Sequence, residues 1–331
     1  MNWIFKLIGL TLLFCAPAWG AGIDLKSLGP EAEKSGWKAK ENKISIMSAE
    51  QRKNLLGLKK YGPKMPKGPV GAFKAIKAVP PALDWRDNGG NFVTAVKDQA
   101  SCGSCWAFSA VGGLESAVMI AKKTPGAGLD LSEQILVSCS TGNQGCNGGY
   151  MDLAADFLKY TGTGLESCYP YTATDGSCKT ACSDSGAYKV ASWGYAASVS
   201  PTVDALKAAL VSYGPLPTTF MVYSDFLYYS SGVYKYTSGV LEGGHAVLLV
   251  GYDDPGQYFI VKNSWGPEWG EDGYFRIAYS ELSSRVLFGE ETLWYTVGDS
   301  PTPPGPTPPP SPGCNSSVGF PGANTIKSWF K

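Results

Sequence analysis

The chain has 331 residues, of which 44% are hydrophobic and 12% aromatic. It can therefore bury at least one sizeable core and is too apolar for general disorder. Its formal net charge is +0, and only 17% of its residues are charged. A chain without an overall basic field is not expected to bind nucleic acid. We expect one or two compact units.

The first 20 residues have the pattern of an export signal. Lys6 precedes an apolar run over 7–14, and small residues follow up to Gly20. A membrane anchor is the alternative, but the apolar run is about half of the roughly 20 residues that a spanning helix needs. We therefore predict a signal peptide over 1–20, no membrane span, and a secreted, periplasmic or lysosome-like location.

Residues 21–79 differ in charge from the chain that follows. They contain 13 Lys/Arg and 5 Asp/Glu, a net charge of +8, whereas 80–297 contains 12 and 22, a net charge of −10. Because opposite charges attract, we expect a removable prosegment that lies across an acidic domain; a basic linker is the alternative. The stretch 47–57 has a serine cap, good helix formers and a final glycine, which predicts one short helix in this segment.

Residues 80–297 have the texture of a domain with helices first and strands second. Helical spacing predicts helices over 104–123, 131–137 and 150–160. Short β-rich runs between turns predict strands over 245–252, 258–262 and 273–278, as in an antiparallel sheet or barrel. This order is typical of an α+β fold.

A proline-rich stretch over 298–313 follows the domain. Proline fixes φ and removes a backbone donor, so this stretch is predicted to be an extended linker. The tail over 314–331 is too short to form a core. Its Cys314 could pair with another chain.

The cysteines indicate one unusual thiol. Removal of the signal peptide takes away Cys15, and seven of the remaining cysteines lie between Cys102 and Cys182. Disulfides are the default after export. If the cysteines of this cluster pair among themselves, one of the seven stays free.

Cys105 is the best candidate for that free thiol. It lies where a glycine-containing turn becomes a helix, and the positive end of a helix lowers the pKa of a thiol there. Cysteine catalysis also requires a base, a group that orients the base, and donors for an oxyanion. His245 is the only histidine in the chain, so it is the one imidazole available as the base.

At these positions the sequence resembles the papain and cathepsin family of cysteine peptidases, over about 80–297. The family signature, Cys-Gly-Ser/Ala-Cys-Trp/Tyr, is matched at 102–106. Gly-Gly-His-Ala-Val surrounds His245, and Lys-Asn-Ser-Trp-Gly surrounds Asn263, which are 140 and 158 residues beyond Cys105. Further matches are Asp-Trp-Arg at 84–86, Leu-Ser-Glu-Gln at 131–134, Gly-Cys-Asn-Gly-Gly at 145–149 and Tyr-Pro-Tyr at 169–171.

The resemblance implies a papain-like two-lobed α+β fold with an active-site cleft between the lobes. A helical lobe would carry the nucleophile on its central helix, and the other lobe would be an antiparallel, barrel-like sheet. The implied roles are nucleophile for Cys105, imidazolium partner for His245, orienting side chain for Asn263, and oxyanion donor for Gln99. Trp265 would shield the hydrogen bond between Asn263 and His245.

The resemblance also indicates where a peptide would bind. In the family, the residue that matches Gly149 hydrogen-bonds an extended substrate, and Gly148 has no side chain to hinder it, although a glycine pair is also typical of a plain tight turn. Several residues match the walls of the main specificity pocket: Tyr150, Met151, Gly244 and, less clearly, Thr219. We expect an apolar or aromatic side chain two residues before the cleaved bond. Glu290 or Glu291 could approach the pocket floor.

The resemblance implies the disulfides Cys102–Cys146 and Cys139–Cys178, which leaves Cys168–Cys182 as a third pair and Cys105 free. Cys178 and Cys182 could exchange roles. Trp37 and the stretch 52–57 resemble the short prosegment of cathepsin B. Cathepsin B acts as an exopeptidase through an inserted loop with histidines, and this chain has no second histidine, so we expect an endopeptidase.

Two alternatives come from other classes. The sequence over 102–105 is also a Cys-x-x-Cys motif, which would suit a redox centre or a zinc half-site, but neither needs the His and Asn motifs. The other alternative is an inactive papain-like module that binds peptides. We predict a monomeric, secreted zymogen that acts on peptides or proteins, is inhibited by its own prosegment, and uses no metal or cofactor.

Overall fold

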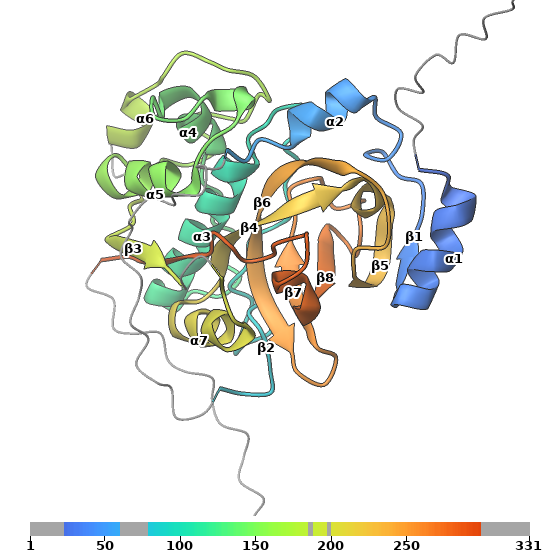
Figure 1. The fold of residues 1–331 in the computed structure, drawn as a ribbon. Coiled ribbons are helices and arrows are strands. Elements are labelled where there is room, and N and C mark those ends of the chain that lie inside the picture. Colours follow the sequence, from blue (N-terminus) through green and yellow to red (C-terminus); the bar gives the residue numbers. More distant parts are fainter. Residues whose placement is uncertain (1–22, 60–78, 185–187, 197–199, 299–331) are drawn as a thin grey trace, which may run out of the picture.

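The computed structural model describes residues 23–59, 79–184, 188–196 and 200–298. The predicted signal peptide, nearly all of the proline-rich linker, and the tail lie outside these residues. Figure 1 shows helices on one side of the molecule and a strongly curved sheet on the other. Two separate hydrophobic cores correspond to the two sides. The α+β prediction is confirmed.

The helical lobe surrounds one central helix, α3 (Cys105–Lys122). All of its residues from Cys105 to Ile120 are buried, as expected of a helix that is enclosed on every side. The rest of the lobe comprises α4 (Glu133–Cys139), a 3-10 turn (Gly145–Asn147), α5 (Met151–Tyr160), α6 (Ala181–Asp184), and a two-stranded sheet of β3 (Ser192–Tyr195) and β9 (Leu293–Thr296). The three helices predicted in this part of the sequence are confirmed.

The second lobe is a seven-stranded sheet, whose order is β1-β5-β8-β7-β6-β2 with β4 paired to β6. Its strands are β1 (Trp37–Ala39), β2 (Ala82–Asp84), β4 (Leu216–Tyr223), β5 (Tyr229–Tyr234), β6 (Leu241–Asp253), β7 (Tyr258–Lys262) and β8 (Tyr274–Ala278). Short 3-10 turns (Ser224–Tyr228 and Tyr279–Leu282) and α7 (Val203–Tyr213) complete the lobe.

The three predicted strands are confirmed, but the expectation of a wholly antiparallel sheet needs correction. β5 and β8 run parallel, whereas the other strand pairs are antiparallel. The strand order begins at β1 and ends at β2, so within the described residues the sheet is open and not a closed barrel.

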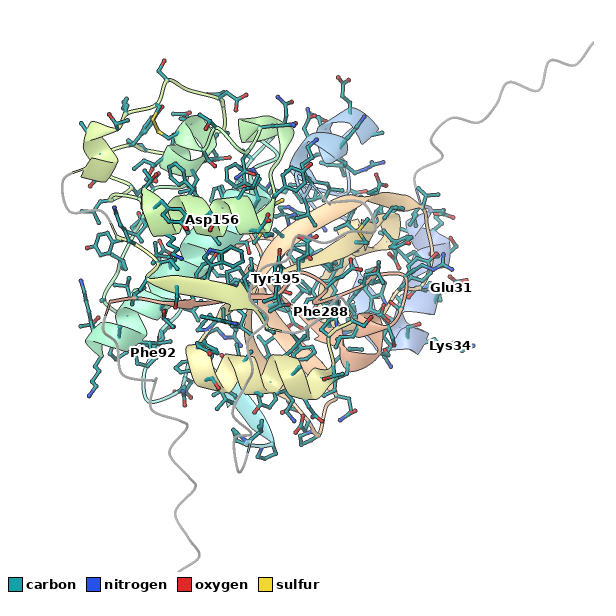
Figure 2. All side chains as sticks on the ribbon, turned by 60° about the vertical axis from the view of Figure 1, so that its left-hand side comes forward. Glu31, Lys34, Phe92, Asp156, Tyr195 and Phe288 are labelled. Carbon is teal, nitrogen blue, oxygen red and sulfur yellow. A yellow bond between two sulfur atoms is a disulfide. The ribbon has the colours of Figure 1, made fainter. Side chains whose placement is uncertain are left out.

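The described part of the predicted prosegment contains two helices, α1 (Leu25–Ser35) and α2 (Ala49–Leu55), so the prediction of a single helix was wrong. The predicted helix is α2, and its Ser48 cap forms a reciprocal capping box with Gln51. The missed helix, α1, contains Pro30 in its interior, which argues against a helix on propensity alone. Tertiary packing overrides that preference because one face of α1 is buried, while Glu31 and Lys34 point outward (Figure 2).

The prosegment is docked on the sheet lobe through aromatic and charged contacts. β1 pairs antiparallel with β5, and the Trp37 ring lies 6.2 Å from that of Tyr229 and 5.3 Å from that of Tyr234. Lys43 forms an ion pair with Asp98 at 2.6 Å. The expected attraction between a basic prosegment and an acidic domain is thus seen in a specific contact.

No helix in the described part of the chain is both long and apolar enough to cross a membrane.

Candidate active site

Cys105 is the first residue of α3 and the one free cysteine among the described residues. It is fully buried, and the backbone amides of Ala246 and Gly57 donate toward its sulfur. Burial nevertheless raises the pKa of the Cys105 thiol to about 11. The expectation that the helix end lowers the pKa of Cys105 is therefore wrong for this state. The loss of solvation on burial outweighs the helix dipole and the two amide donors. The thiol is neutral at neutral pH.

His245 lies on β6 and is fully buried. Its Nε2 donates to Oδ1 of Asn263 at 2.8 Å, since a carboxamide oxygen can only accept. Nδ1 is then the ring nitrogen with a free lone pair, and it has no hydrogen-bond partner among the described residues. Burial lowers the pKa of His245 to about 4, although the bond to Asn263 acts in the opposite direction. The imidazole is therefore neutral beside a neutral thiol.

The neighbours of the imidazole hold Asn263 and the ring in place. The backbone amide of Ser264 donates to Oδ1 of Asn263 at 2.8 Å. Trp265 is fully buried, and its ring centroid lies 4.8 Å from that of His245. Phe220 packs on the same imidazole at 5.8 Å. An apolar enclosure of this kind excludes water from the His245–Asn263 bond.

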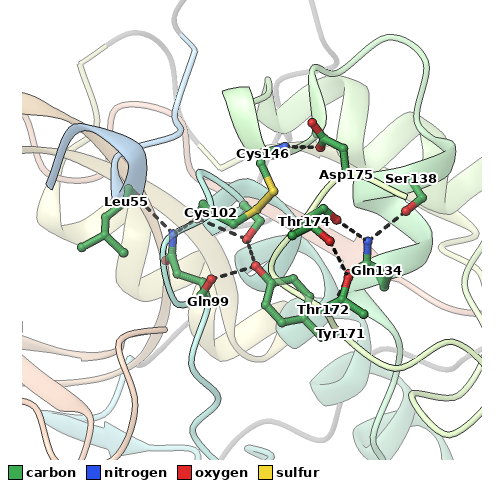
Figure 3. The surroundings of a disulfide bond; sticks show 12 residues. Leu55, Gln99, Cys102, Gln134, Ser138, Cys146, Tyr171, Thr172, Thr174 and Asp175 are labelled. Carbon is green, nitrogen blue, oxygen red and sulfur yellow. Dashed lines mark hydrogen bonds between the residues drawn. A yellow bond between two sulfur atoms is a disulfide. The ribbon is translucent and has the colours of Figure 1, made fainter. Parts of the chain in front are cut away.

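Gln99 is fully buried. Nε2 donates to the backbone carbonyls of Leu55 and Cys102, each at 2.9 Å (Figure 3). Oε1 accepts from the Ser264 hydroxyl at 2.7 Å, which fixes the orientation of the amide. Sequence reasoning did not assign a role to Ser264. It adjoins Asn263, so one short segment orients both the imidazole and the Gln99 amide.

The three disulfides have the pairing that the resemblance implies: Cys102–Cys146, Cys139–Cys178 and Cys168–Cys182. Next to the first of these, the backbone amide of Gly103 donates to the carbonyl of Cys146 at 2.9 Å. Because Cys102 is bonded to Cys146 (Figure 3), a Cys102–Cys105 redox pair is not formed. The turn before Cys105 is instead anchored to the loop that precedes Gly148 and Gly149.

The prosegment occupies the predicted substrate cleft. Gly149 donates its amide to the carbonyl of Gly57 and accepts from the amide of Lys59, each at 2.8 Å. The amide of Leu58 donates to the carbonyl of Gly244 at 3.2 Å. A Cβ on Gly148 would lie 2.4 Å from the Gly57 carbonyl oxygen, so a residue with a side chain could not allow this approach.

Leu58 packs against residues that the sequence analysis assigned to an apolar pocket. Its side chain is 8% exposed and belongs to the same core cluster as Met151 and Ala246. Thr219 is buried in β4 opposite Ala246, and its hydroxyl accepts from the amide of Glu291 at 3.3 Å. Leu58, Met151 and Ala246 thus share one cluster, and Thr219 is paired with Ala246 across the sheet.

Tyr150 is the residue that precedes α5. Its backbone amide donates to Oδ1 of Asn143 at 2.7 Å, directly before Met151 begins α5. The turn that carries Gly149 is thereby fixed to the helical lobe.

A buried charge network behind Asn263 was not predicted. Lys97 contacts the carboxylates of Glu133 and Asp130 at 2.8 and 2.7 Å, and that of Glu115 on α3 at 3.4 Å. Lys262, next to Asn263, donates to Thr94 at 3.0 Å, and Thr94 in turn donates to Glu115. Burial lowers the pKa of Lys262. The network ties the end of β7, next to Asn263, to the helix that carries Cys105.

Comparison with known proteins identifies the family. The model of the papain family of cysteine proteases matches residues 79–287. Cathepsin B-like CP3 of Giardia intestinalis is 40% identical over 277 residues, covering 76% of this chain and 86% of that protein. Human cathepsin L2 is 40% identical over 259 residues, covering 74% of each.

Solved structures of precursors are similar as well. Procathepsin L2 from the larval midgut of Tenebrio molitor is 31% identical, with a TM-score of 0.69 over 82% of this chain and 89% of that one. Procathepsin B S9 from Trypanosoma congolense, at 23% identity and a TM-score of 0.72 over 83% and 97%, shares the fold. The chain belongs to the papain family of cysteine proteases.

Proposed function

We propose that this protein is a secreted zymogen of a cysteine endopeptidase that hydrolyses peptide bonds through an acyl-enzyme on Cys105. The observation that carries the proposal is the hydrogen bond from Gln99 to the Leu55 carbonyl. The amide proposed to bind the oxyanion already binds a peptide carbonyl, and the proposed nucleophile, Cys105, is a free thiol. His245, held by Asn263, supplies the base.

The reaction follows from these groups. The Cys105 thiol gives its proton to Nδ1 of His245, and the sulfur attacks the scissile carbonyl carbon. The oxyanion accepts hydrogen bonds from Gln99 Nε2 and the Cys105 amide. The imidazolium then protonates the leaving amine as the C–N bond breaks, which leaves a thioester. Water, deprotonated by His245, hydrolyses the thioester and restores the thiol.

The prosegment acts in this proposal as an intramolecular inhibitor. Near the sulfur it presents the backbone amide of Gly57. It also uses the hydrogen bonds of Gly149 and Gln99 that a substrate requires. Leu58 fills the apolar pocket, which supports an apolar side chain two residues before the cleaved bond.

The proposal is tested by removing the prosegment near residue 79. We expect the processed protein to hydrolyse a peptide with leucine two residues before the bond, and the unprocessed chain to be inactive at neutral pH. Equal activity of the two forms would contradict the inhibitory role, and inactivity of both would favour a peptide-binding module.

Replacing Asn263 with alanine should lower kcat by about 10²-fold and leave KM nearly unchanged. Without the Oδ1 acceptor the imidazole loses its fixed orientation, and a small misplacement of a catalytic group costs about that factor. Steady-state kinetics on the processed enzyme separate the two constants. An unchanged kcat would refute the orienting role of Asn263.

Docking of the prosegment should weaken as the pH falls. The pKa of His245 is about 4 in the docked state, below its ordinary value of 6.5. Between pH 6.5 and pH 4, His245 binds a proton when the prosegment has left the site but not when it is docked. The docked state is therefore favoured above pH 6.5 and loses stability toward pH 4. The inhibition constant of a peptide covering 21–79 against processed enzyme should rise up to about tenfold per pH unit in this window. A constant value from pH 7 to pH 4.5 would contradict this.

A further inference from the structure

Glu242 lies at an irregularity in the pairing of β6, the strand that carries His245, with β4. Along the β4–β6 pair, Val222 is opposite Gly243, and the next residue, Tyr223, is opposite Leu241. Glu242 is thus the extra residue of a β-bulge. Bulges occur next to active sites, where they redirect a side chain out of the regular alternation. This one lies three residues before His245.

The redirected carboxylate meets a cation of the prosegment. Oε2 of Glu242 lies 3.5 Å from Nε of Arg52, and the two side chains are only 12% and 18% exposed. Arg52 is also held by a hydrogen bond from its Nη1 to the Met47 carbonyl at 2.8 Å. Within the described residues, Arg52 is the ion-pair partner of Glu242. Loss of the prosegment removes this cation and leaves the carboxylate at the wall of the cleft.

The order of contacts along the prosegment shows which end of the cleft Glu242 faces. Leu58 lies against Gly244, which we assign to the pocket for the side chain two residues before the cleaved bond. The amide of Gly57 lies at the Cys105 thiol. Leu55 reaches Gln99, and Arg52 lies one helical turn farther from Leu58. Glu242 is therefore beyond the thiol, on the side where the leaving part of a substrate binds.

We infer that Glu242 determines specificity by binding an arginine or lysine side chain in the first two residues after the cleaved bond, and that Arg52 occupies this position in the zymogen. A guanidinium matches a carboxylate in charge and geometry. The low exposure of the Arg52–Glu242 pair means that solvent screens it less than a surface pair. The inference rests on the proposed peptidase function, because it concerns the substrate of the same site.

The test uses enzyme processed from the full chain and two quenched fluorescent peptides. Both have leucine two residues before the bond, and they carry arginine or alanine in both of the two positions after it. We expect kcat/KM to be about tenfold higher for the arginine peptide, a factor typical of one charge-assisted contact. In Glu242→Gln the ratio should fall close to one, and in Glu242→Lys it should drop below one.

Asp204→Asn is the matched control, because Asp204 is exposed on α7 and its loss changes the net charge equally. Its ratio should equal that of the wild type. A wild-type ratio near one, or a ratio that is the same in Glu242→Gln and wild type, would overturn the inference and make Glu242 only an anchor for the prosegment. Failure of the wild type to cleave either peptide would instead refute the peptidase function itself.

Discussion

Replacing Cys105 with serine should reduce kcat/KM for peptide hydrolysis by at least about 10⁴-fold, the scale of removing a member of a catalytic unit. No other described cysteine is free, so none can replace it as a nucleophile. The serine hydroxyl is far less acidic than a thiol, and His245 would have to remove its proton at much greater cost. The unprocessed variant should also fail to release its own prosegment, if that step depends on the same site.

The measurement is hydrolysis by wild-type and Cys105→Ser proteins, each with its prosegment removed by an added protease. Unchanged thermal unfolding and three intact disulfides would show that the variant is folded. A variant that kept more than about 1% of wild-type activity would show that the chemistry does not depend on this thiol.

Replacing Gly57 with alanine should expose the active site of the unprocessed chain. A Cβ at this position would lie 1.8 Å from the carbonyl oxygen of Gly103, on the turn just before Cys105. The nearest atoms belong to the backbone of Gly103 and cannot turn aside as a flexible side chain could, so the prosegment must move away. A misfit of this kind costs about 1–3 kcal/mol, which corresponds to roughly 5- to 150-fold more of the open form.

The rate at which iodoacetamide alkylates Cys105 in the unprocessed chain reports this population, and it should rise by the same factor. Gly29→Ala is the control, since no atom lies within 4 Å of a Cβ there and Gly29 belongs to the same prosegment. Equal alkylation rates in Gly57→Ala and Gly29→Ala would show that the Gly57 contact does not keep the site closed.

The elements that carry the candidate catalytic residues could be predicted because their signals are local. Cys105, His245 and Asn263 each lie in a short motif, and the elements that carry the first two were predicted close to their observed bounds. The contacts of Gln99 with Leu55 and Ser264 join residues that are 44 and 165 positions away from it. No periodicity or motif reports such pairs, so the sequence indicated a prosegment but not which of its atoms occupy the cleft.

The prosegment and the thiol show two further limits of reasoning from the sequence. Pro30 argues against a helix at 25–35, yet burial of Leu28 and Ala32 stabilises one. The helix end was expected to lower the pKa of Cys105, but the pKa depends on how much solvent the docked prosegment removes. In both cases a long-range contact outweighs the local preference.

The most direct test of the zymogen account is mass spectrometry after incubation with a thiol-reactive epoxide. The account predicts a single adduct, on Cys105, in the processed protein, and no adduct in the unprocessed chain, where Gly57 and burial cover the thiol. An unlabelled Cys105 after processing, or equal labelling before and after it, would contradict the account.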